Sequence, residues 1–524
     1  MEKLKKNGKI IPKKSSEIKH SKISLGFEKL DRNVFDPEKA YDKVADCGVK
    51  KVRLQSGWQR TEKEKGVYDF EWLDTIVDNF VNRGIEPWMC LCYGNSLYTE
   101  QAKEVFGAVG CPPIFSEEEK QAWINYVKAT VVHYKGRVNY FEIWNEPDGI
   151  WCWKHGVNAT ELGKFTLATA KAIKETNPDA KTIGGVVCLR KLDFLNTAFK
   201  TGMGEYLDFI SFHEYTHDER NVFEKVESFR ALAKMYNPDI ELIQGESGTQ
   251  SRRGGHGALW DGAWTEEIQA KQLARHTLAD LLSDVHFTSY FSCMDMIEAL
   301  NGNVNDKSSY LDYGYFGILG ADFDEDGRST GTYYKKPSYY VLQNICSLFA
   351  EEIKVCTQPI FVHPLYSAPQ YENQLHRYEI TSGSFERENG KAFVYWYPTN
   401  IMTTSYNSSI TVEFYTEYKD IKLIDIMDGS VYEIPEEMIE DKGDGVYVIK
   451  ELPIKDTPLI LTFGSFMILA NHIRRTDYKD ENGINNRSVY QYRHSHNRKI
   501  CGRRVGNCIY REKSRKSARS GRKI

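Results

Sequence analysis

Short apolar stretches alternate with longer amphipathic ones from residue 23 to about residue 350. Apolar runs rich in β-branched and aromatic residues favour buried strands, and apolar residues three to four positions apart favour helices. Eight strand–helix pairs follow one another. The expected strands are 23–29, 51–56, 85–92, 138–143, 182–188, 209–214, 241–245 and 288–294. The expected helices are 36–47, 70–83, 117–134, 160–175, 192–201, 224–236, 265–282 and 337–349.

This alternation predicts a parallel sheet. Strands that alternate with helices form βαβ units, and eight units favour an α/β fold of the (β/α)8 TIM barrel type. The alternative is a doubly wound open sheet, which usually carries a Gly-rich phosphate-binding turn after its first strand. No such turn follows residues 23–29. We therefore expect a barrel over residues 23–352.

The pattern changes after the barrel. Short alternating or apolar stretches are now separated by turn pairs such as Asn389-Gly390, Asp428-Gly429 and Asp444-Gly445, which are typical of hairpins. The strands expected here are 377–381, 392–397, 409–415, 422–426, 445–450 and 459–462. They predict a smaller antiparallel β-sandwich domain over residues 353–465 that packs on the side of the barrel.

The two ends of the chain have a different composition. Residues 1–22 are rich in Lys and have no apolar segment of a secretory signal, so we expect a basic, disordered arm. Residues 466–524 are expected to be a basic, disordered tail, since 471–524 hold 16 Lys or Arg against four Asp or Glu. The tail contains no folded motif that reads bases, so no nucleic-acid partner is expected.

Composition narrows the class of protein. The 524 residues carry a formal net charge of −4, and no apolar run approaches the roughly 18 residues of a membrane span, so no membrane partner is expected. Eleven cysteines without regular spacing favour reduced thiols and a cytoplasmic location. Ten Trp, 32 Tyr and 25 Phe give weak support to a carbohydrate ligand, because aromatic rings stack on sugar faces. The oligomeric state stays open.

One strand leads directly into a candidate catalytic group. The strand expected at 138–143 continues into Trp144-Asn145-Glu146-Pro147. Because proline cannot donate a ladder hydrogen bond, Glu146 should lie where the strand stops. Apolar neighbours raise the pKa of a carboxyl group, which suits acid–base work. A lone Glu at this place would more often be an ion-pair partner, so Glu146 needs support from other strands.

The carboxyl ends of barrel strands meet at one face, where barrel enzymes place their active sites. The side chains expected at that face are Arg53 and Trp58 near the second strand, Tyr93 and Asn95 near the third, Trp144, Asn145 and Glu146 at the fourth, His213 and Tyr215 at the sixth, and Glu246 at the seventh. Glu142 and Glu214 are expected to point away, since neighbouring residues of a strand alternate in direction. Trp151, Trp153, Trp260 and Trp264 fall on loops at the same face, as sugar platforms or as packing anchors.

These residues resemble those of glycoside hydrolases of clan A, and within the clan the β-xylosidase-like glycoside hydrolase family 39. The resemblance covers residues 23–350 and implies that Glu146 is the acid/base and Glu246 the nucleophile. It also implies that Arg53, His213 and Tyr215 surround the nucleophile. The tryptophan that usually ends the eighth strand in the clan has no counterpart in Ser292–Met296.

The expected chemistry is retaining hydrolysis, which uses one protonated and one ionised carboxyl group about 5–5.5 Å apart. Arg53 would keep Glu246 ionised, Tyr215 would hydrogen-bond to it, and Asn145 would bind a sugar 2-hydroxyl. No cofactor or metal is expected. We predict a retaining β-glycosidase that acts on the ends of short oligosaccharides. An endo-β-glycanase and a non-catalytic carbohydrate-binding barrel are the alternatives.

Overall fold

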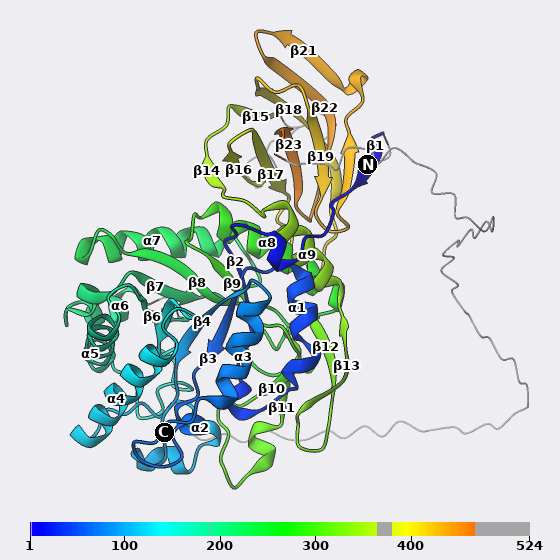
Figure 1. Cartoon of the computed structure of the whole chain (residues 1–524). Helices are drawn as coiled ribbons and strands as arrows, with labels where there is room; N and C mark the ends of the chain where they lie inside the picture. Colours follow the sequence, from blue (N-terminus) through cyan, green and yellow to red (C-terminus); the bar gives the residue numbers. More distant parts are fainter. Residues whose placement is uncertain (2, 190, 364–379, 467–524) are drawn as a thin grey trace, which may run out of the picture. The chain divides into compact units, whose positions relative to one another are not determined.

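The computed structural model describes residues 1, 3–189, 191–363 and 380–466. Eight parallel strands close into a barrel in the order of the chain, because the first strand pairs with both the second and the eighth (Figure 1). The strands are β2 (Ile23–Gly26), β3 (Lys51–Gln55), β4 (Glu86–Leu91), β5 (Tyr140–Ile143), β6 (Lys181–Val187), β7 (Phe209–His213), β8 (Glu241–Ser247) and β9 (Thr288–Tyr290). The predicted α/β barrel is confirmed.

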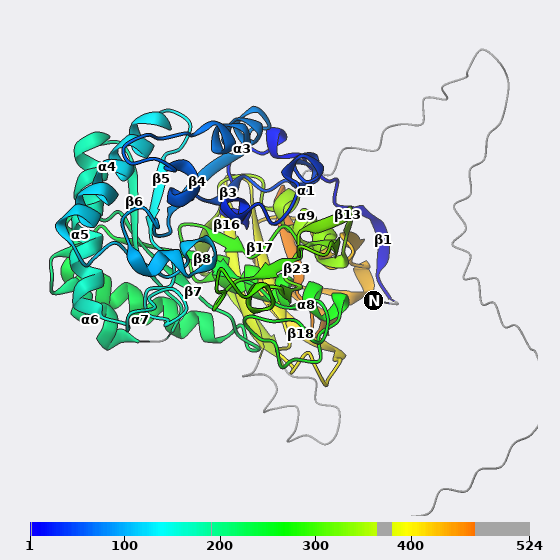
Figure 2. The ribbon, with the colours of Figure 1, turned by 90° about the horizontal axis from the view of Figure 1, so that it is seen from below.

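Helices cover the outside of the barrel, and Figure 2 shows α3 to α7 around the strands. The helices are α1 (Tyr41–Cys47), α2 (Trp58–Thr61), α3 (Glu71–Asn82), α4 (Glu117–His133), α5 (Ala159–Thr176), α6 (Leu192–Phe199), α7 (Asn221–Tyr236), α8 (Glu266–Leu282) and α9 (Pro337–Leu348). Capping side chains fix several starts. The Ser116 hydroxyl accepts the N–H of Glu119, and Thr265 accepts that of Ile268. No helix among the described residues is long and apolar enough to cross a membrane.

Two hairpins lie between the last barrel strand and α9, where the sequence pattern predicts none. They are formed by β10 (Met296–Glu298) with β11 (Asp312–Gly314), and by β12 (Leu319–Phe323) with β13 (Ser329–Lys335). The predicted strand 288–294 instead ends at Tyr290. Strands β10 and β11 have only three residues each, and β12 and β13 are partly exposed, so none of the four has the continuous apolar run of a buried barrel strand.

The residues after α9 form two antiparallel sheets. Their strands are β14 (Lys354–Cys356), β15 (Ile360–His363), β16 (Thr381–Arg387), β17 (Gly390–Trp396), β18 (Asn407–Tyr415), β19 (Ile421–Asp425), β20 (Ser430–Glu433), β21 (Ile439–Gly443), β22 (Val446–Lys455) and β23 (Leu459–Gly464). One sheet has the order β1-β20-β19-β23-β17-β16-β14, with β1 at Lys5–Lys9, and the other has the order β15-β18-β22-β21. Residues 377–379 of the predicted strand 377–381 lie outside the described residues, and Thr381 begins β16.

Strand β17 shows how this domain packs, because both of its faces are apolar. Phe393 and Tyr395 lie in the core shared with the four-stranded sheet. Val394 and Trp396, which alternate with them, belong to the core cluster that includes the barrel. The seven-stranded sheet is therefore buried on one face by the second sheet and on the other by the barrel.

The N-terminal segment is not the disordered arm that its lysines suggested. Residues Lys5–Lys9 form β1, which pairs antiparallel with β20 at the edge of the seven-stranded sheet (Figure 1). Leu4, which precedes β1, is buried in the sandwich core. The prediction failed because edge strands favour Lys over an apolar alternation. At the other end, Phe466 is buried against Phe349 and Arg387, and the predicted tail from residue 467 lies outside the described residues.

Candidate active site

A cavity of about 390 Å³ lies at the carboxyl ends of the barrel strands. Glu146 reaches it through a change of backbone direction after β5. Trp144 and Glu146 have φ values of +67° and +41°, a left-handed conformation that few non-glycine residues adopt. Such strain is typical of functional positions. The turn takes Glu146 out of the two-residue alternation of the strand and places its carboxyl group in the cavity wall.

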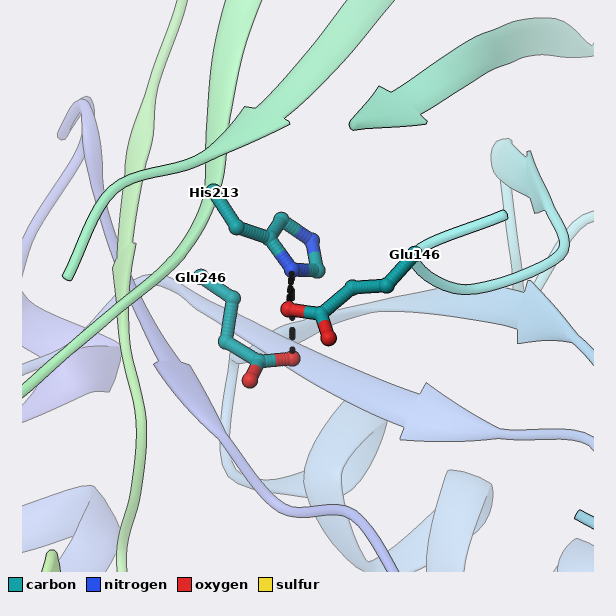
Figure 3. A group of neighbouring side chains, drawn as sticks. All are labelled: Glu146, His213 and Glu246. Carbon is teal, nitrogen blue, oxygen red and sulfur yellow. Dashed lines mark hydrogen bonds and ion pairs between the residues drawn. The ribbon is translucent and has the colours of Figure 1, made fainter. Parts of the chain in front are cut away.

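Three titratable side chains from three strands meet there (Figure 3). Nδ1 of His213 lies 2.8 Å from Oε1 of Glu146 and 3.7 Å from Oε2 of Glu246. One nitrogen and one oxygen from each carboxyl group all lie within 4.8 Å of one another. Glu146 and Glu246, predicted to face each other across the barrel mouth, are thus brought together.

Glu246 accepts a strong donor at each of its oxygens. Nη1 of Arg53 donates to Oε2 at 2.7 Å, and the Tyr215 hydroxyl donates to Oε1 at 2.5 Å. Both bonds require an acceptor, which suits an ionised carboxylate. Burial and the charge of Glu246 raise the pKa of Tyr215, so the phenol keeps its proton. The two donors fix the orientation of the Glu246 carboxyl group.

Glu146 lies in surroundings of the opposite kind. Burial raises its pKa, and the Trp151 indole, which donates to Oε2 at 2.5 Å, opposes this rise only in part. Burial also lowers the pKa of His213 to about 4. The imidazole is therefore neutral near pH 7 and gives Glu146 no cationic partner. Burial thus favours the protonated form of Glu146, whereas Glu246 accepts a hydrogen bond at each of its oxygens, and an acid/base and nucleophile pair requires this kind of difference.

Arg53 is held by several groups besides Glu246. Its Nε and Nη2 donate to Oε2 of Glu142 at 2.8 and 2.5 Å, and Nη2 donates to Oδ1 of Asn145 at 2.8 Å. The prediction that Glu142 points away is therefore wrong. Glu142 is the inward-facing residue of β5, and Glu146 enters the site by the left-handed turn instead. Glu214 forms an ion pair with Lys225 of α7, at 2.9 Å.

Some of the predicted site residues line the cavity and others do not. Asn145, Trp151, Tyr215 and the third-strand Tyr93 line it together with the two catalytic candidates. Arg53 and His213 do not line the cavity but contact its two glutamates. The remaining expected side chains do not line it either, and they are Trp58, Asn95, Trp144, Trp153, Trp260 and Trp264.

Trp144 and Trp58 lie outside the cavity wall because they pack against other residues. Trp144 is fully buried and its indole donates to the carbonyl of Cys152. Trp58 stacks on Tyr98. These two residues were expected at this face, and their contacts show that they support it from the core, because large aromatic rings at strand ends serve the core as readily as a ligand.

The remaining members of that group also lie outside the cavity wall. Asn95 donates to the carbonyl of Glu62 and accepts the N–H of Leu97, so it fixes a turn rather than a substrate. Trp260 is 66% exposed and is not part of the cavity lining. Asn95 therefore has a supporting role, and Trp260 lies outside the cavity wall, so its part as a sugar platform stays a prediction.

Several residues of the cavity wall were not predicted from the sequence, and four of them carry charge or an aromatic ring close to the two glutamates. Glu28 and Lys29 follow β2, and the predicted strand 23–29 had absorbed both. Glu298 comes from the unpredicted strand β10, and its carboxylate pairs with the Lys29 ammonium group at 2.8 Å. Phe291 directly follows β9 and lines the cavity, so it supplies the aromatic ring at the strand end where the clan usually has tryptophan.

Glu146, His213 and Glu246 also form a donor set of the type that metal ions use. However, each oxygen of Glu246 already accepts a proton donor, and one of these donors is the guanidinium group of Arg53. A second positive charge at this place would be repelled by the first. The geometry suits proton transfer and nucleophilic attack better than metal binding.

Comparisons with known proteins agree with this chemistry. Residues 40–353 match the family described as "Glycosyl hydrolases family 39". A 165-residue stretch is 28% identical to a β-xylosidase from Geobacillus stearothermophilus, and it covers 29% of this chain and 31% of that relative. The chain thus spans about a third of the length of the curated relative it matches.

Two solved structures share the fold. One is a family 39 glycoside hydrolase from Bacteroides cellulosilyticus, with a TM-score of 0.58 and 17% sequence identity. The match covers 84% of this chain and 80% of the Bacteroides chain. A family 39 β-xylosidase from Caulobacter crescentus has a TM-score of 0.52 at 16% identity, with coverages of 88% and 99%. The resemblance that Trp144–Pro147 and Glu246 carried is confirmed. The chain belongs to glycosyl hydrolases family 39 of clan A and is a glycosidase.

Proposed function

We propose that this glycosidase cleaves β-glycosidic bonds with retention of configuration, with Glu246 as the nucleophile and Glu146 as the acid/base. The observation that carries the proposal is the short separation of the two carboxyl groups, whose facing oxygens lie within 4.8 Å. Retaining enzymes hold these groups about 5–5.5 Å apart, whereas inverting enzymes leave about 6.5–9.5 Å for a water molecule.

The first step forms a covalent intermediate. An oxygen of Glu246 attacks the anomeric carbon and forms an ester bond, while the glycosidic C–O bond breaks and the leaving oxygen takes the proton of Glu146. Burial raises the pKa of Glu146 and so favours the form that carries this proton. Asn145, held by Arg53, lies in the cavity wall where it can bind the 2-hydroxyl.

The second step regenerates the enzyme. Glu146, now ionised, takes a proton from water, and the resulting hydroxide attacks the anomeric carbon. The ester bond breaks and the carboxylate of Glu246 returns to its bonds with Arg53 and Tyr215. Two displacements restore the original anomeric configuration.

Short oligosaccharides are the substrate that we propose, with the cut at a terminal sugar. A cavity of about 390 Å³ falls at the small end of ligand sites. The residues between β9 and α9 contribute Phe291, Glu298 and Phe316 to its wall. Because two related proteins are described as β-xylosidases, a terminal β-xylosyl unit is the first substrate to test.

The products formed early in the reaction distinguish exo-acting from endo-acting cleavage. We expect the enzyme to release xylose alone from a linear β-xylo-oligosaccharide at early times. An early mixture of di- and trisaccharides would favour an endo-β-glycanase. Family membership supports a hydrolase over the non-catalytic alternative.

The nucleophile is tested by chemical rescue. Glu246→Ala should abolish hydrolysis of an activated aryl β-glycoside, and azide should partly restore cleavage because it replaces the missing carboxylate. The rescued product should be the glycosyl azide of inverted configuration, which nuclear magnetic resonance identifies. Near-normal hydrolysis by Glu246→Ala without azide would refute the assignment.

A further inference from the structure

Two parts of the cavity wall differ in chemistry. Apart from Glu146 and Glu246, the charged side chains among the described lining residues all follow β2 or end β10, and they are Glu28, Lys29, Arg32 and Glu298. The loops after β4, β5 and β6 contribute Val109, Trp151, Cys152, Cys188 and Leu189 instead. We call these five residues the apolar side of the cavity, since buried cysteines behave as small apolar residues.

Tyr93 also follows β4 but belongs to the charged part of the wall. Its hydroxyl accepts a hydrogen bond from Nε2 of Gln55 at 3.2 Å. The Arg32 guanidinium group lies over its ring, 5.6 Å from the centroid. The polar groups of the wall thus gather on the side of β2 and β3.

Short contacts place the apolar side next to Glu146. The Trp151 indole donates to Oε2 of Glu146 at 2.5 Å. Asp148, two residues after Glu146, accepts the backbone N–H of Leu189 at 2.8 Å and that of Cys188 at 3.0 Å. The acid/base candidate and the loop after β6 are therefore held by the same short turn.

The loop after β4 completes this side. The backbone N–H of Lys154 donates to the carbonyl of Gly110 at 2.9 Å, so the residue after Val109 is bound to the loop that carries Trp151. Trp151 and Leu189 line the cavity and are only partly buried, so both side chains keep accessible surface. A ligand in the cavity can reach them.

The roles of the two glutamates decide which part of a substrate meets this surface. The acid/base gives its proton to the oxygen of the leaving group, so the leaving group lies on the side of Glu146. A polar group needs a hydrogen-bond partner when it leaves water, and the Trp151 N–H already donates to Glu146. An alkyl chain or an aromatic ring needs no partner and gains free energy from burial.

We propose that the apolar side is a leaving-group subsite for alkyl and aryl groups, with Leu189 as a specificity-determining residue. The enzyme then hydrolyses β-glycosides of apolar alcohols as well as short oligosaccharides. The proposal rests on the proposed glycosidase function. The bond between the anomeric carbon and the alcohol oxygen breaks, that oxygen takes the proton of Glu146, and water later releases the sugar from Glu246.

Two alkyl glycosides test the subsite. The kcat/KM for xylose release is measured on methyl and on butyl β-xyloside, whose leaving alcohols have similar acidity and need the same help from Glu146. Each buried methylene group is worth about fourfold in affinity. We expect the wild type to favour the butyl compound by about 10- to 60-fold. A ratio near one would overturn the proposal.

Leu189→Asn should lower this ratio by about threefold or more, because an amide replaces the apolar surface at nearly the same size. The ratio is the decisive quantity, since a general loss of activity lowers both rates and leaves it unchanged. Leu192→Asn is the matched control, because Leu192 of α6 is 44% exposed and does not line the cavity. An unchanged ratio in Leu189→Asn would contradict the role of Leu189. Leu189→Ala repeats the measurement without a new polar group, and circular dichroism melting checks that each variant is folded.

The subsite and the proposed hydrolysis fail in different ways. If both xylosides are hydrolysed at equal rates, the result counts against the subsite alone. If neither is hydrolysed, the proposed substrate is wrong, and calorimetric binding of methyl and butyl 1-thio-β-xyloside decides. Tighter binding of the butyl compound to the wild type, with a smaller difference in Leu189→Asn, would support the subsite. Equal affinity for the two compounds, or binding of neither, would refute it.

Discussion

Trp151 was expected as a sugar platform or a packing anchor, but in the structure it contacts Glu146 and affects the protonation of that group. Its indole N–H donates to a Glu146 oxygen and so favours the ionised form, against the effect of burial. Trp151 also lines the cavity. The loop after β5 therefore carries both the acid/base and the group that limits how far its pKa rises.

Replacing this donor should shift the pH profile. In Trp151→Phe the hydrogen bond is lost, so the ionised form of Glu146 is less stable and its pKa rises further. A general acid works while protonated, so the alkaline limb of kcat/KM should move to higher pH. Trp260→Phe, at an exposed position outside the cavity, is the control and should leave both limbs in place. An unchanged alkaline limb in Trp151→Phe would contradict this account.

The acid role of Glu146 makes the effect of its removal depend on the leaving group. Glu146→Ala should greatly reduce the rate of hydrolysis of xylo-oligosaccharides, because their leaving alkoxide needs a proton. It should reduce the rate only slightly for a dinitrophenyl xyloside, whose leaving group needs none. The two substrates should diverge by about 10²–10⁴-fold, the usual contribution of general acid–base catalysis. Steady-state kinetics measures this divergence.

A second observation in the same variant concerns the covalent intermediate. The hydrolysis step loses its base, so the intermediate should accumulate and produce a burst of dinitrophenol. The alkaline limb should also disappear. Equal losses on both substrates with that limb intact would mean that another group donates the proton.

At the scale of elements, β8 holds the nucleophile next to a position that requires glycine. A Cβ atom at Gly245 would lie 2.1 Å from Oγ of Ser211 on β7 and about 3 Å from polar atoms of Glu142 and His213. The adjacent residue is Glu246. The close approach of β7 and β8 thus fixes the nucleophile through the backbone.

This packing gives a testable pair of variants. Gly245→Ala should lower the free energy of unfolding by about 1–3 kcal/mol, as overpacking usually does, and should lower kcat because Glu246 shifts. Ser211→Ala removes the clashing hydroxyl, so the double variant should regain part of both losses. Chemical denaturation and steady-state kinetics measure them. Additive effects of the two substitutions would show that the clash does not determine the geometry.

Whether a strand could be predicted from the sequence depended on how completely it is buried. All eight barrel strands could be predicted because strands covered on both faces are continuous apolar runs. The hairpins β10–β11 and β12–β13 could not, since the strands of the first have only three residues each and those of the second are partly polar and exposed. Glu298 was missed with them. The directions of Glu142 and Glu146 at the end of β5 could not be predicted together either. A two-residue alternation does not reveal the left-handed turn that separates them.

At the scale of the whole molecule, a buried ion pair joins the barrel to the sandwich. Glu219 lies 2.9 Å from Arg275 of α8 and accepts the indole N–H of Trp396 at 2.7 Å. Arg275 also donates to the carbonyl of Thr399 at 2.9 Å. Both charged side chains are almost fully buried, so the contact between the domains depends on a complete set of partners.

Removal of one partner should destabilise both domains together. Glu219→Ala leaves the Arg275 charge buried and unpaired, which typically costs about 3–5 kcal/mol. Calorimetry should show one transition at a lower temperature, with kcat/KM at low temperature little changed because no cavity residue is touched. Asp218→Ala, which breaks the exposed pair with Arg220, is the control and should cost under about 1 kcal/mol. A stability loss of similar size in both variants would refute the interface role.

Strand β1 joins two segments that are far apart in the sequence. Lys5 pairs with Glu433, so β1 cannot take its place at the edge of the sheet until the residues between them have been synthesised. The barrel between them can fold during this interval, whereas the seven-stranded sheet cannot be completed until β20 emerges. Contacts so distant in sequence form late and slowly. A substitution that prevents β1 from pairing would therefore act on a late stage of folding and would leave the barrel free to form first.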